Sequence, residues 1–341
     1  MLRQKVSQNR GKDMALNFSF YRCENEKEWD NFVANKSMNG TFLQTRKFIN
    51  YHPNERFKDC SICIRKGNEL AAVILACEVE DEGKKTFFAH KGSTFGGITI
   101  ASNIYTASIV NELMEGLQSF LIENGFQKIY LKMVPDIYQK KGTDLLDYFL
   151  YKNGFQCYNE LNYYMVMENY KEEVTAPFTS GKRRDYRYSL KNELVFKKLE
   201  TRDEIAAYYQ VLFMNLKKFQ LTAVHSLDDL FDLKFNRFDH RIEFYGVFKN
   251  DDIIAGSMLF YFGDDIVHTQ YLSSNENYLK LFPMDFLICN LIKTAVEKGM
   301  RIFTFGICTE DQGHYLNLGL SRFKEGFGTE FCINRSYEKV L

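Results

Sequence analysis

The segment "PMDFLICNLIKTAVEKGMRIFTFGI", residues 283–307, decides the fold class. Pro283 suits the first turn of a helix, Gly299 suits the end of that helix, and a short apolar run follows. One face of the helix is apolar and carries Leu287, Ile288, Leu291 and Ala295. The segment therefore predicts an amphipathic helix that leads into a strand.

The same order occurs earlier in "TASIVNELMEGLQSFLIENGFQKIYLKM", residues 106–133, where Gly125 takes the place of Gly299. Three further pairs of segments also match in order. They are "NEKEWDNFV" and "TRDEIAAYYQVL" as capped helices, "IRKGNELAAVILACEV" and "VFKNDDIIAGSMLFYF" as hairpins, and "YKNGFQCYNELNYYMVM" and "FKEGFGTEFCINRSYEKVL" as a closing turn with a strand. Equivalent positions lie roughly 170 to 185 residues apart, which indicates one structural plan repeated twice.

Each half reads helix, hairpin, helix, strand, helix, strand. This order predicts an α/β (α+β) fold in which a mixed, mostly antiparallel sheet is flanked by helices. We place the N-terminal domain at residues 16–168, the C-terminal domain at 182–341 and the linker at 169–181, where polar residues, proline and glycine break the pattern. Residues 1–15 are expected to form a disordered extension, and translation starts at the first methionine or at Met14.

The composition removes several function classes. The formal net charge is +0, so no field of the whole molecule attracts nucleic acid or an acidic membrane. Eight cysteines include one close pair, Cys60 and Cys63, without a second pair to complete a zinc site, so we expect free thiols, no metal and a cytoplasmic protein. The longest apolar run, residues 71–77, is far shorter than the ~20 residues of a membrane helix, and no signal peptide is evident, so we expect no integral membrane segment.

The early helix, the hairpin, the long helix and the closing "GF" turn together resemble the GNAT acyltransferase fold. Two such units in tandem resemble the Fem-type peptidoglycan-bridge aminoacyltransferases and their relatives from surface-polysaccharide loci. The motifs that carry this likeness are "GTFLQT" (40–45), "HKGSTFGGI" (90–98), "GKRRDYRYSLKN" (181–192), "IIAGSMLF" (253–260) and "GLSRFKEGFG" (319–328). The chain departs from the family in two ways: it has no segment long enough for a helical-hairpin arm, and it reads "FTFG" at residues 303–306 where relatives often read "FDFG".

The resemblance implies transfer of an activated acyl group to an amine of a cell-wall or glycan precursor, without a tightly bound cofactor. In the Fem branch the donor is an aminoacyl-tRNA, and the acceptor is a muramyl-pentapeptide nucleotide or a lipid-linked intermediate. In the wider superfamily the donor is acyl-CoA.

The junction "SSNENYLKLFPMDFL", residues 273–287, bears on the choice of donor. A CoA-dependent GNAT enzyme usually places a glycine-rich turn between this strand and the following helix, so that free backbone N–H groups meet the pyrophosphate. The junction contains no glycine, and in the first half the glycines of "GSTFGG" come well before the helix that starts near Thr106. The sequence therefore favours a donor other than ordinary CoA.

Two residues are candidates for the catalytic centre. Lys324 lies in "RFKEGFG", where the resemblance implies a lysine that holds the acyl carbonyl or an acceptor phosphate; the alternative is a surface lysine like its counterpart Lys152. If Lys324 is catalytic, its replacement by Ala should lower turnover without unfolding the protein. Tyr271 closes a strand beside the expected opening of the sheet, although packing is the commoner role there; nearby His268 is more typical of a core histidine than of a general base.

Three groups of residues are candidates for substrate binding. Arg183, Arg184 and Arg187 lie among tyrosines in a basic cluster that suits phosphate on tRNA or on a nucleotide sugar, or else forms an ordinary solvated helix start. His90, Ser93 and Thr94 lie on a glycine-flanked loop that either lines a cleft or forms a bulge. Gln44 and Thr45 either bind the acceptor or cap a second helix.

The favoured hypothesis is a Fem-like transferase that acts on a nucleotide-linked or lipid-linked envelope precursor. Two alternatives stay open, namely an acyl-CoA-dependent N-acyltransferase of an amino sugar and a silent module that binds a glycan or nucleotide sugar. No Ser-His-Asp or Cys-His arrangement is evident, so direct attack of an amine on the acyl carbonyl is expected.

Overall fold

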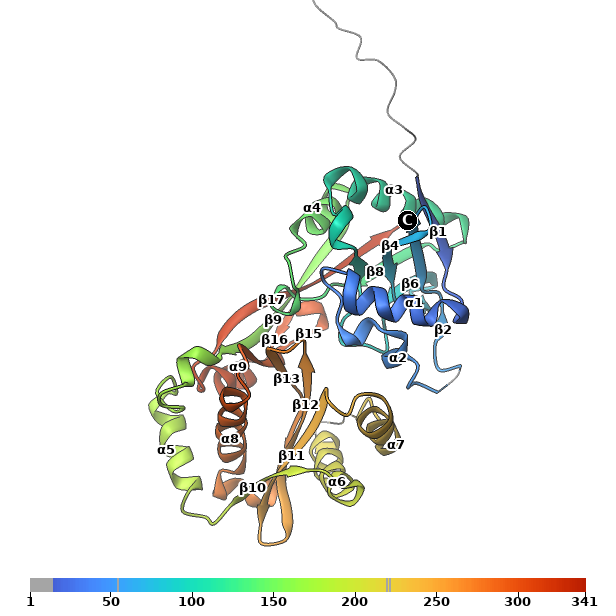
Figure 1. Ribbon diagram of the computed structural model, residues 1–341. Helices are drawn as coiled ribbons and strands as arrows, with labels where there is room; N and C mark the ends of the chain where they lie inside the picture. Colours follow the sequence, from blue (N-terminus) through green and yellow to red (C-terminus); the bar gives the residue numbers. More distant parts are fainter. Residues whose placement is uncertain (1–14, 54, 219, 221) are drawn as a thin grey trace, which may run out of the picture.

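The computed structural model describes residues 15–53, 55–218, 220 and 222–341. Most of the extension expected at residues 1–15, together with Met14, lies outside the described residues. Figure 1 shows two lobes, each with helices packed on a sheet, joined through long strands that run between them.

The elements of the two halves follow the order that the sequence predicts. The first half contains β1 (Leu16–Phe20), α1 (Glu26–Asn31), α2 (Arg46–Ile49), β2 (Lys58–Asp59), β3 (Ile62–Lys66), β4 (Glu69–Ile74), β5 (Cys77–Asp81), β6 (Lys84–Ala89), β7 (Ile98–Ile100), α3 (Ala107–Glu123), β8 (Lys128–Lys132), α4 (Asp144–Lys152) and β9 (Gln156–Val166). The second half contains α5 (Ser180–Ser189), β10 (Val195–Leu199), α6 (Arg202–Lys218), α7 (Leu227–Phe231), β11 (Ile242–Lys249), β12 (Asp252–Phe262), β13 (Ile266–Ser274), α8 (Pro283–Glu297), β14 (Ile302–Ile307), β15 (Thr309–Glu310), β16 (Tyr315–Leu316), α9 (Leu318–Glu325) and β17 (Glu330–Val340).

Helices α3 and α8 confirm the helices predicted from residues 106–133 and 283–307. Pro283 occupies the first turn of α8, and all four residues of its predicted apolar face are buried. Gly125 and Gly299 follow α3 and α8 with φ values of 76° and 70°, a left-handed conformation that glycine adopts without strain. At the start of α6, Thr201 and Glu204 cap each other reciprocally as expected, whereas the Asn25 side chain makes no cap at α1.

The sheet is mostly antiparallel, as predicted. An eleven-stranded sheet has the order β10-β11-β12-β13-β14-β9-β17-β8-β6-β5-β2, and a four-stranded sheet has the order β1-β3-β4-β7. Among the described strands only β13 with β14 and β6 with β8 pair in parallel. These two parallel pairs are equivalent in the two halves, which supports the repeated plan.

The halves exchange their last strands. Strand β9, from the first half, pairs with β14 of the second half, while β17, from the second half, pairs with β8 of the first half and with β9. Figure 1 shows β17, in red, running from the second half into the lobe formed by the first. The division at residues 169–181 stays a prediction, because one sheet continues through both halves and α5 already starts at Ser180.

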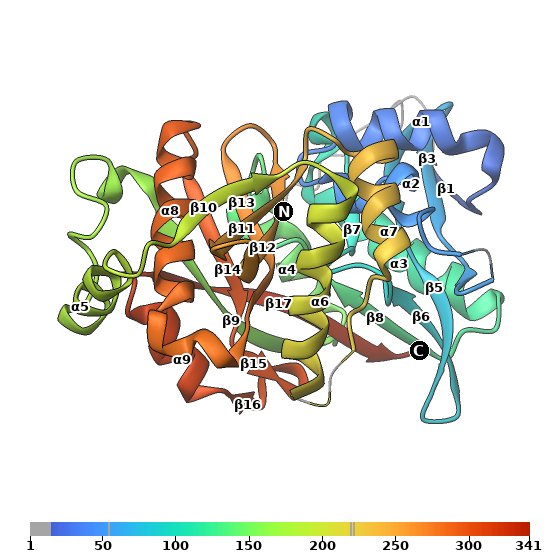
Figure 2. The same ribbon diagram turned by 90° about the horizontal axis from the view of Figure 1, so that it is seen from below.

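One apolar core lies between the two halves, in addition to the cores within each half. Phe42, which precedes α2, packs against Phe260 and Phe262 of β12, with ring centroids 5.4 Å and 5.0 Å apart. Tyr138 from the first half joins the same cluster. Figures 1 and 2 both show α7 of the second half beside α2 of the first.

Two further observations concern the described part of the chain. Its eight cysteines are free thiols, and no group of three or more potential metal ligands occurs among these residues. No helix within it is both long enough and apolar enough to cross a membrane.

Candidate active site

Strands β13 and β14 separate in the middle of the sheet. Their register runs only from Ile266 opposite Ile302 to His268 opposite Thr304, after which both strands continue without pairing to each other. A β-bulge in β13 lies beside this opening, and the buried Oε1 of Gln270 has no hydrogen-bond partner there among the described residues. The opening is the place where this sheet can accept an extended group between two strands.

A buried polar network closes the base of the opening. The Tyr138 hydroxyl and His268 Nδ1 share a hydrogen bond of 3.0 Å, and the same hydroxyl donates to Thr304 Oγ1 at 3.4 Å. Thr304 Oγ1 in turn donates to Asn162 Oδ1 at 3.3 Å. Burial, followed by the positive charge of Lys324, lowers the pKa of His268 to about 3. The imidazole is therefore neutral near pH 7 and acts as a hydrogen-bond partner rather than as a proton store.

Lys324 lies on α9 and is 4% exposed. Its ammonium donates hydrogen bonds to the main-chain carbonyls of Phe305 (3.0 Å), Gly306 (3.0 Å) and Ile307 (2.8 Å), at the end of β14. Burial lowers its pKa. All three ammonium protons are thus donated to main-chain carbonyls. Lys324 therefore stabilises the end of β14, which forms one wall of the opening. Direct contact with substrate stays a prediction.

Tyr271 lies on β13 beyond the point where the strands separate. Its hydroxyl bonds His225 Nδ1 at 2.7 Å, and the His225 ring stacks on Tyr51 of the first half with centroids 5.3 Å apart. Burial raises the pKa of Tyr271 to about 12 and lowers that of His225 to about 4. Both groups are neutral at pH 7, so this contact links the two halves without charge. A catalytic role for Tyr271 stays a prediction.

The start of α8 lacks a phosphate cradle. A short helix, η8 (Glu276–Leu281), fills the junction after β13, and Phe282 caps α8 in a left-handed conformation. Asp285, in the first turn of α8, is 7% exposed and forms an ion pair of 2.6 Å with Lys182 of α5. A phosphate at this helix end would therefore meet a resident carboxylate that already has its cation.

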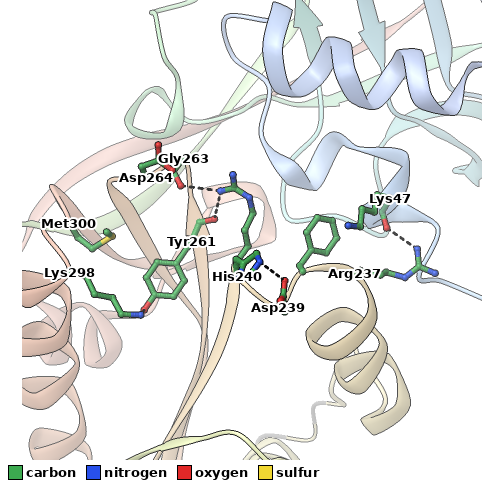
Figure 3. A pocket seen from close by; sticks show the side chains of 11 residues that line it. Lys47, Arg237, Asp239, His240, Tyr261, Gly263, Asp264, Lys298 and Met300 are labelled. Atoms are coloured by element: carbon green, nitrogen blue, oxygen red, sulfur yellow. Dashed lines mark hydrogen bonds and ion pairs between the residues drawn. The ribbon is translucent and has the colours of Figure 1, made fainter.

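A cavity of about 620 Å³ lies between α2 of the first half and the second half. Figure 3 shows Lys47 and Arg237 on one side of it and Lys298 on the other. The lining residues are Lys47, Arg237, Phe238, Asp239, His240, Arg241, Tyr261, Gly263, Asp264, Lys298 and Met300. This volume lies within the range of small-molecule sites, roughly 300 to 1,000 Å³.

Two cationic side chains in the cavity lining have no carboxylate partner in the described part of the chain, and the carboxylates of Asp239 and Asp264 line the same cavity. Arg241 donates only to the carbonyls of Tyr261 (3.4 Å) and Gly263 (3.0 Å), and within the described chain it has no carboxylate partner. Lys47 is exposed, and its ammonium lies 5.2 Å from the Phe238 ring centroid and likewise has no carboxylate partner among these residues. Cationic side chains without a carboxylate partner are the kind of group that binds phosphate in proteins.

The basic cluster predicted for substrate binding lies on helix α5, which contributes no residue to the lining of this cavity. Arg183 donates to the carbonyls of Ala176 and Phe178, Arg184 pairs with Asp185 at 3.1 Å, and Arg187 is exposed. These contacts match the alternative of an ordinary helix start. The structure brings none of the three into the lining of the cavity, and their role in binding stays a prediction.

The loop with His90, Ser93 and Thr94 has a local structure of its own. His90 is 3% exposed and accepts from the Gly92 N–H at 2.8 Å, and burial lowers its pKa to about 3. Ser93 donates to the Phe95 carbonyl at 2.9 Å, and Thr94 is exposed. His90 borders a small cavity of about 180 Å³ within the first half rather than the one between the halves.

Gln44 and Thr45 lie at the N-terminus of α2. Gln44 Nε2 donates to the Gly96 carbonyl at 2.9 Å, which fastens the glycine-flanked loop, and Thr45 Oγ1 accepts from the Phe48 N–H at 3.1 Å. The alternative of a capped second helix is therefore confirmed for Thr45. Contact of either residue with an acceptor stays a prediction.

Sequence reasoning missed several residues that the structure brings together. Lys47 and Arg241 are isolated basic residues without a motif, and nothing local relates Tyr138 to His268. Asp285 is different, because an acidic residue in the first turn after Pro283 is a known signal of a capped helix start. That signal predicts that the carboxylate of Asp285 already occupies the anion position at the N-terminus of α8.

Comparison with known proteins agrees with the fold. A family model described as an acetyltransferase (GNAT) domain matches residues 180–325, which is less than half of the chain. The crystal structure of FemX has a TM-score of 0.67 at 15% identity and covers 95% of this chain and 97% of its own. A tandem GNAT protein from the clavulanic acid biosynthesis pathway has a TM-score of 0.57 at 8% identity and covers 95% and 98%.

The C-terminal domain of a putative lysylphosphatidylglycerol synthetase from Agrobacterium fabrum is also similar, with a TM-score of 0.56 at 11% identity over 79% of this chain and 81% of that one. No curated protein matches the sequence. At these identities the likeness concerns the fold. The chain therefore has the GNAT acyltransferase fold and shares its full-length architecture with FemX and with a tandem GNAT protein.

Proposed function

We propose that this protein transfers an aminoacyl group, carried by tRNA, to an amine of a phosphate-bearing envelope precursor. The acceptor is a nucleotide-linked or lipid-linked glycan or peptide. The observation that carries the proposal is the cavity between the halves, in which the side chains of Arg241 and Lys47 have no carboxylate partner among the described residues. Such a site suits a diphosphate. The cavity lies by the turn at Gly263 and Asp264 before β13, and we place the acyl group in the opening between β13 and β14, beyond His268 on the same strand.

The reaction needs few groups from the protein. The acceptor amine attacks the ester carbonyl, the C–N bond forms, and the tRNA hydroxyl leaves with the proton that the amine releases, directly or through the substrate. The task of the protein is to hold the two reactants in line and to keep the developing oxyanion near main-chain N–H groups of the separated strands.

A second candidate function is acyl-CoA-dependent N-acylation of an amino sugar. The match of residues 180–325 to a GNAT acetyltransferase model favours it. The ion pair between Asp285 and Lys182 at the start of α8 opposes it, because the CoA pyrophosphate would lie against a buried carboxylate.

Binding measurements separate these functions. We expect the muramyl-pentapeptide nucleotide to raise the thermal midpoint in a saturable way, since a ligand at about 100 times its Kd adds roughly 2.7 kcal/mol, and acetyl-CoA to have no effect at millimolar concentration. Arg241→Ala should weaken nucleotide binding by about 10- to 100-fold, because a charge-assisted hydrogen bond contributes about 1.5–3 kcal/mol.

Arg301→Ala is the matched control, because Arg301 is exposed, is paired with Asp265 at 2.7 Å and does not line the cavity. A saturable rise with acetyl-CoA and none with the nucleotide would instead favour the CoA-dependent function.

A further inference from the structure

The central strands β8, β17 and β9 carry a ladder of polar side chains on one face. The register places Lys132 opposite Ser336, and Asn334 opposite Glu160. Because side chains alternate between the two faces of a strand, positions two residues apart point the same way. Lys132, Asn334 and Glu160 therefore share one face and form a diagonal row across three adjacent strands, in which Lys132 lies directly opposite Ser336 and only diagonally to Asn334. We call these three residues the middle row.

The rows on one side of this group are paired within the protein. Lys128 forms an ion pair with Glu338 at 3.1 Å, and the Tyr130 hydroxyl donates to Ser336 Oγ at 3.0 Å.

The rows on the other side are also paired. Asn162 donates to Cys332 Sγ at 3.4 Å and accepts from Thr304 Oγ1 at 3.3 Å. The ladder thus satisfies its polar groups with internal partners on both sides of the middle row.

The middle row is the exception. The side chains of Lys132 and Glu160 form neither a hydrogen bond nor an ion pair with any described residue. The charge of each nevertheless acts on the pKa of the other. The Oδ1 atom of Asn334 is buried and also lacks a partner among the described residues. Burial lowers the pKa of Lys132 and raises that of Glu160. Burial of polar groups without hydrogen bonds costs free energy, so a ligand that forms hydrogen bonds to all three side chains would recover part of that cost.

The row is bounded but remains in contact with solvent. The Gly96 N–H donates to the Lys132 carbonyl at 2.8 Å, which places the glycine-flanked loop along one side. The short helix η9 (Asp311–Gly313) packs directly on β9, since a Cβ at Gly313 would lie 2.0 Å from the Asn159 carbonyl oxygen. Lys132 and Glu160 both keep partial exposure, so a small group can reach them.

We propose that Lys132, Asn334 and Glu160 bind an α-aminoacyl head group, an ammonium one carbon away from a carbonyl carbon. The ammonium donates to Glu160 and to Asn334 Oδ1, and the carbonyl or carboxylate oxygens accept from Lys132. This inference rests on the proposed function, for which it supplies the site of an amino acid moiety.

The charges of the row select this class of ligand. A simple anion would bond Lys132 but would face the carboxylate of Glu160, and a simple amine would bond Glu160 but would face the ammonium of Lys132. Among a simple anion, a simple amine and a group with both a donor and an acceptor end, the last is the one that satisfies all three side chains. Two sources have this chemistry: the aminoacyl ester of the donor, and a terminal amino acid of the acceptor.

Lysine NMR tests the assignment on the full chain. The Lys132 resonance is identified in ¹³C-lysine-labelled protein by its loss in Lys132→Arg, and the twenty common amino acids, their methyl esters, ethylamine and propionate are added singly at millimolar concentration. We expect at least one amino acid or ester to shift this resonance in a saturable way, and ethylamine and propionate to bind at least tenfold more weakly. Tighter binding of the ester assigns the site to the donor, and tighter binding of the free amino acid assigns it to the acceptor.

Paired variants supply the control. Glu160→Gln should weaken the bound amino acid or ester at least tenfold, whereas Glu330→Gln should not, because Glu330 lies on β17 and is exposed, with a hydrogen bond from Tyr164 at 3.0 Å. Absence of a shift with every amino acid and ester, or equal binding of propionate, would overturn the assignment. Nucleotide binding to the native protein is measured independently, so its absence would refute the proposed function while leaving this site standing.

Discussion

Deletion of residues 330–341 is expected to abolish cooperative folding of both halves. Strand β17 fills the space between β8 and β9, so its removal leaves two long unpaired edges in the middle of the sheet. It also removes Tyr337, which is 3% exposed within the first core and donates to Asp147 at 2.6 Å. Loss of one buried aromatic side chain alone costs about 3–5 kcal/mol, a large share of the roughly 5–15 kcal/mol that stabilises a typical protein.

Urea denaturation followed by circular dichroism measures the effect, with size-exclusion chromatography to detect aggregation. Phe331→Ser is the control, because Phe331 lies on the same strand but is 69% exposed, and a surface change usually stays within about 0.5 kcal/mol. A truncated chain that still unfolded in one transition at the midpoint of the full protein would show that the strand exchange does not hold the halves together.

Replacement of Lys324 by Met is expected to lower the free energy of unfolding by about 3 kcal/mol or more and to abolish transfer at the same time. The ammonium satisfies three main-chain carbonyls at the end of β14, and each buried polar group left without a partner costs about 1–3 kcal/mol. Because these carbonyls form one wall of the opening between β13 and β14, the same change should distort the place that the proposed function gives to the acyl group.

Lys152→Met is the matched control for Lys324→Met. Lys152 holds the equivalent position at the end of α4, but it is exposed and bonds only the Asn111 side chain at 2.9 Å, so its loss should change stability by less than about 0.5 kcal/mol. If Lys324→Met unfolded like the native protein and lost only turnover, the direct catalytic role inferred from the sequence would be right, and the supporting role would be wrong.

The fold was predictable wherever its signals are local. The turns at residues 66–69 and 249–252, the stops at Gly125 and Gly299 and the reciprocal cap at Thr201 are written in a few neighbouring residues, and the structure contains all of them. The strand exchange was not predictable. Strands β9 and β17 have similar patterns and closing turns, so nothing local indicates which half each one joins.

The site was harder to predict for the same reason. "RFKEGFG" shows that a lysine precedes a glycine turn, but the three carbonyls that receive its protons come from residues 305–307, brought there by tertiary structure. Likewise, Lys132 lies in an ordinary strand sequence. Only the tertiary structure shows that it shares one face with Asn334 and Glu160. Its side chain has no hydrogen bond or ion pair to any described residue.

The most direct test is single-turnover transfer to the muramyl-pentapeptide nucleotide from two donors, labelled aminoacyl-tRNA and labelled acetyl-CoA, with mass spectrometry of the product. The account predicts a product one aminoacyl group heavier from the tRNA donor, no product from acetyl-CoA, and a loss of transfer in Arg241→Ala that excess nucleotide restores. Acetylated product from acetyl-CoA together with none from any aminoacyl-tRNA would contradict it.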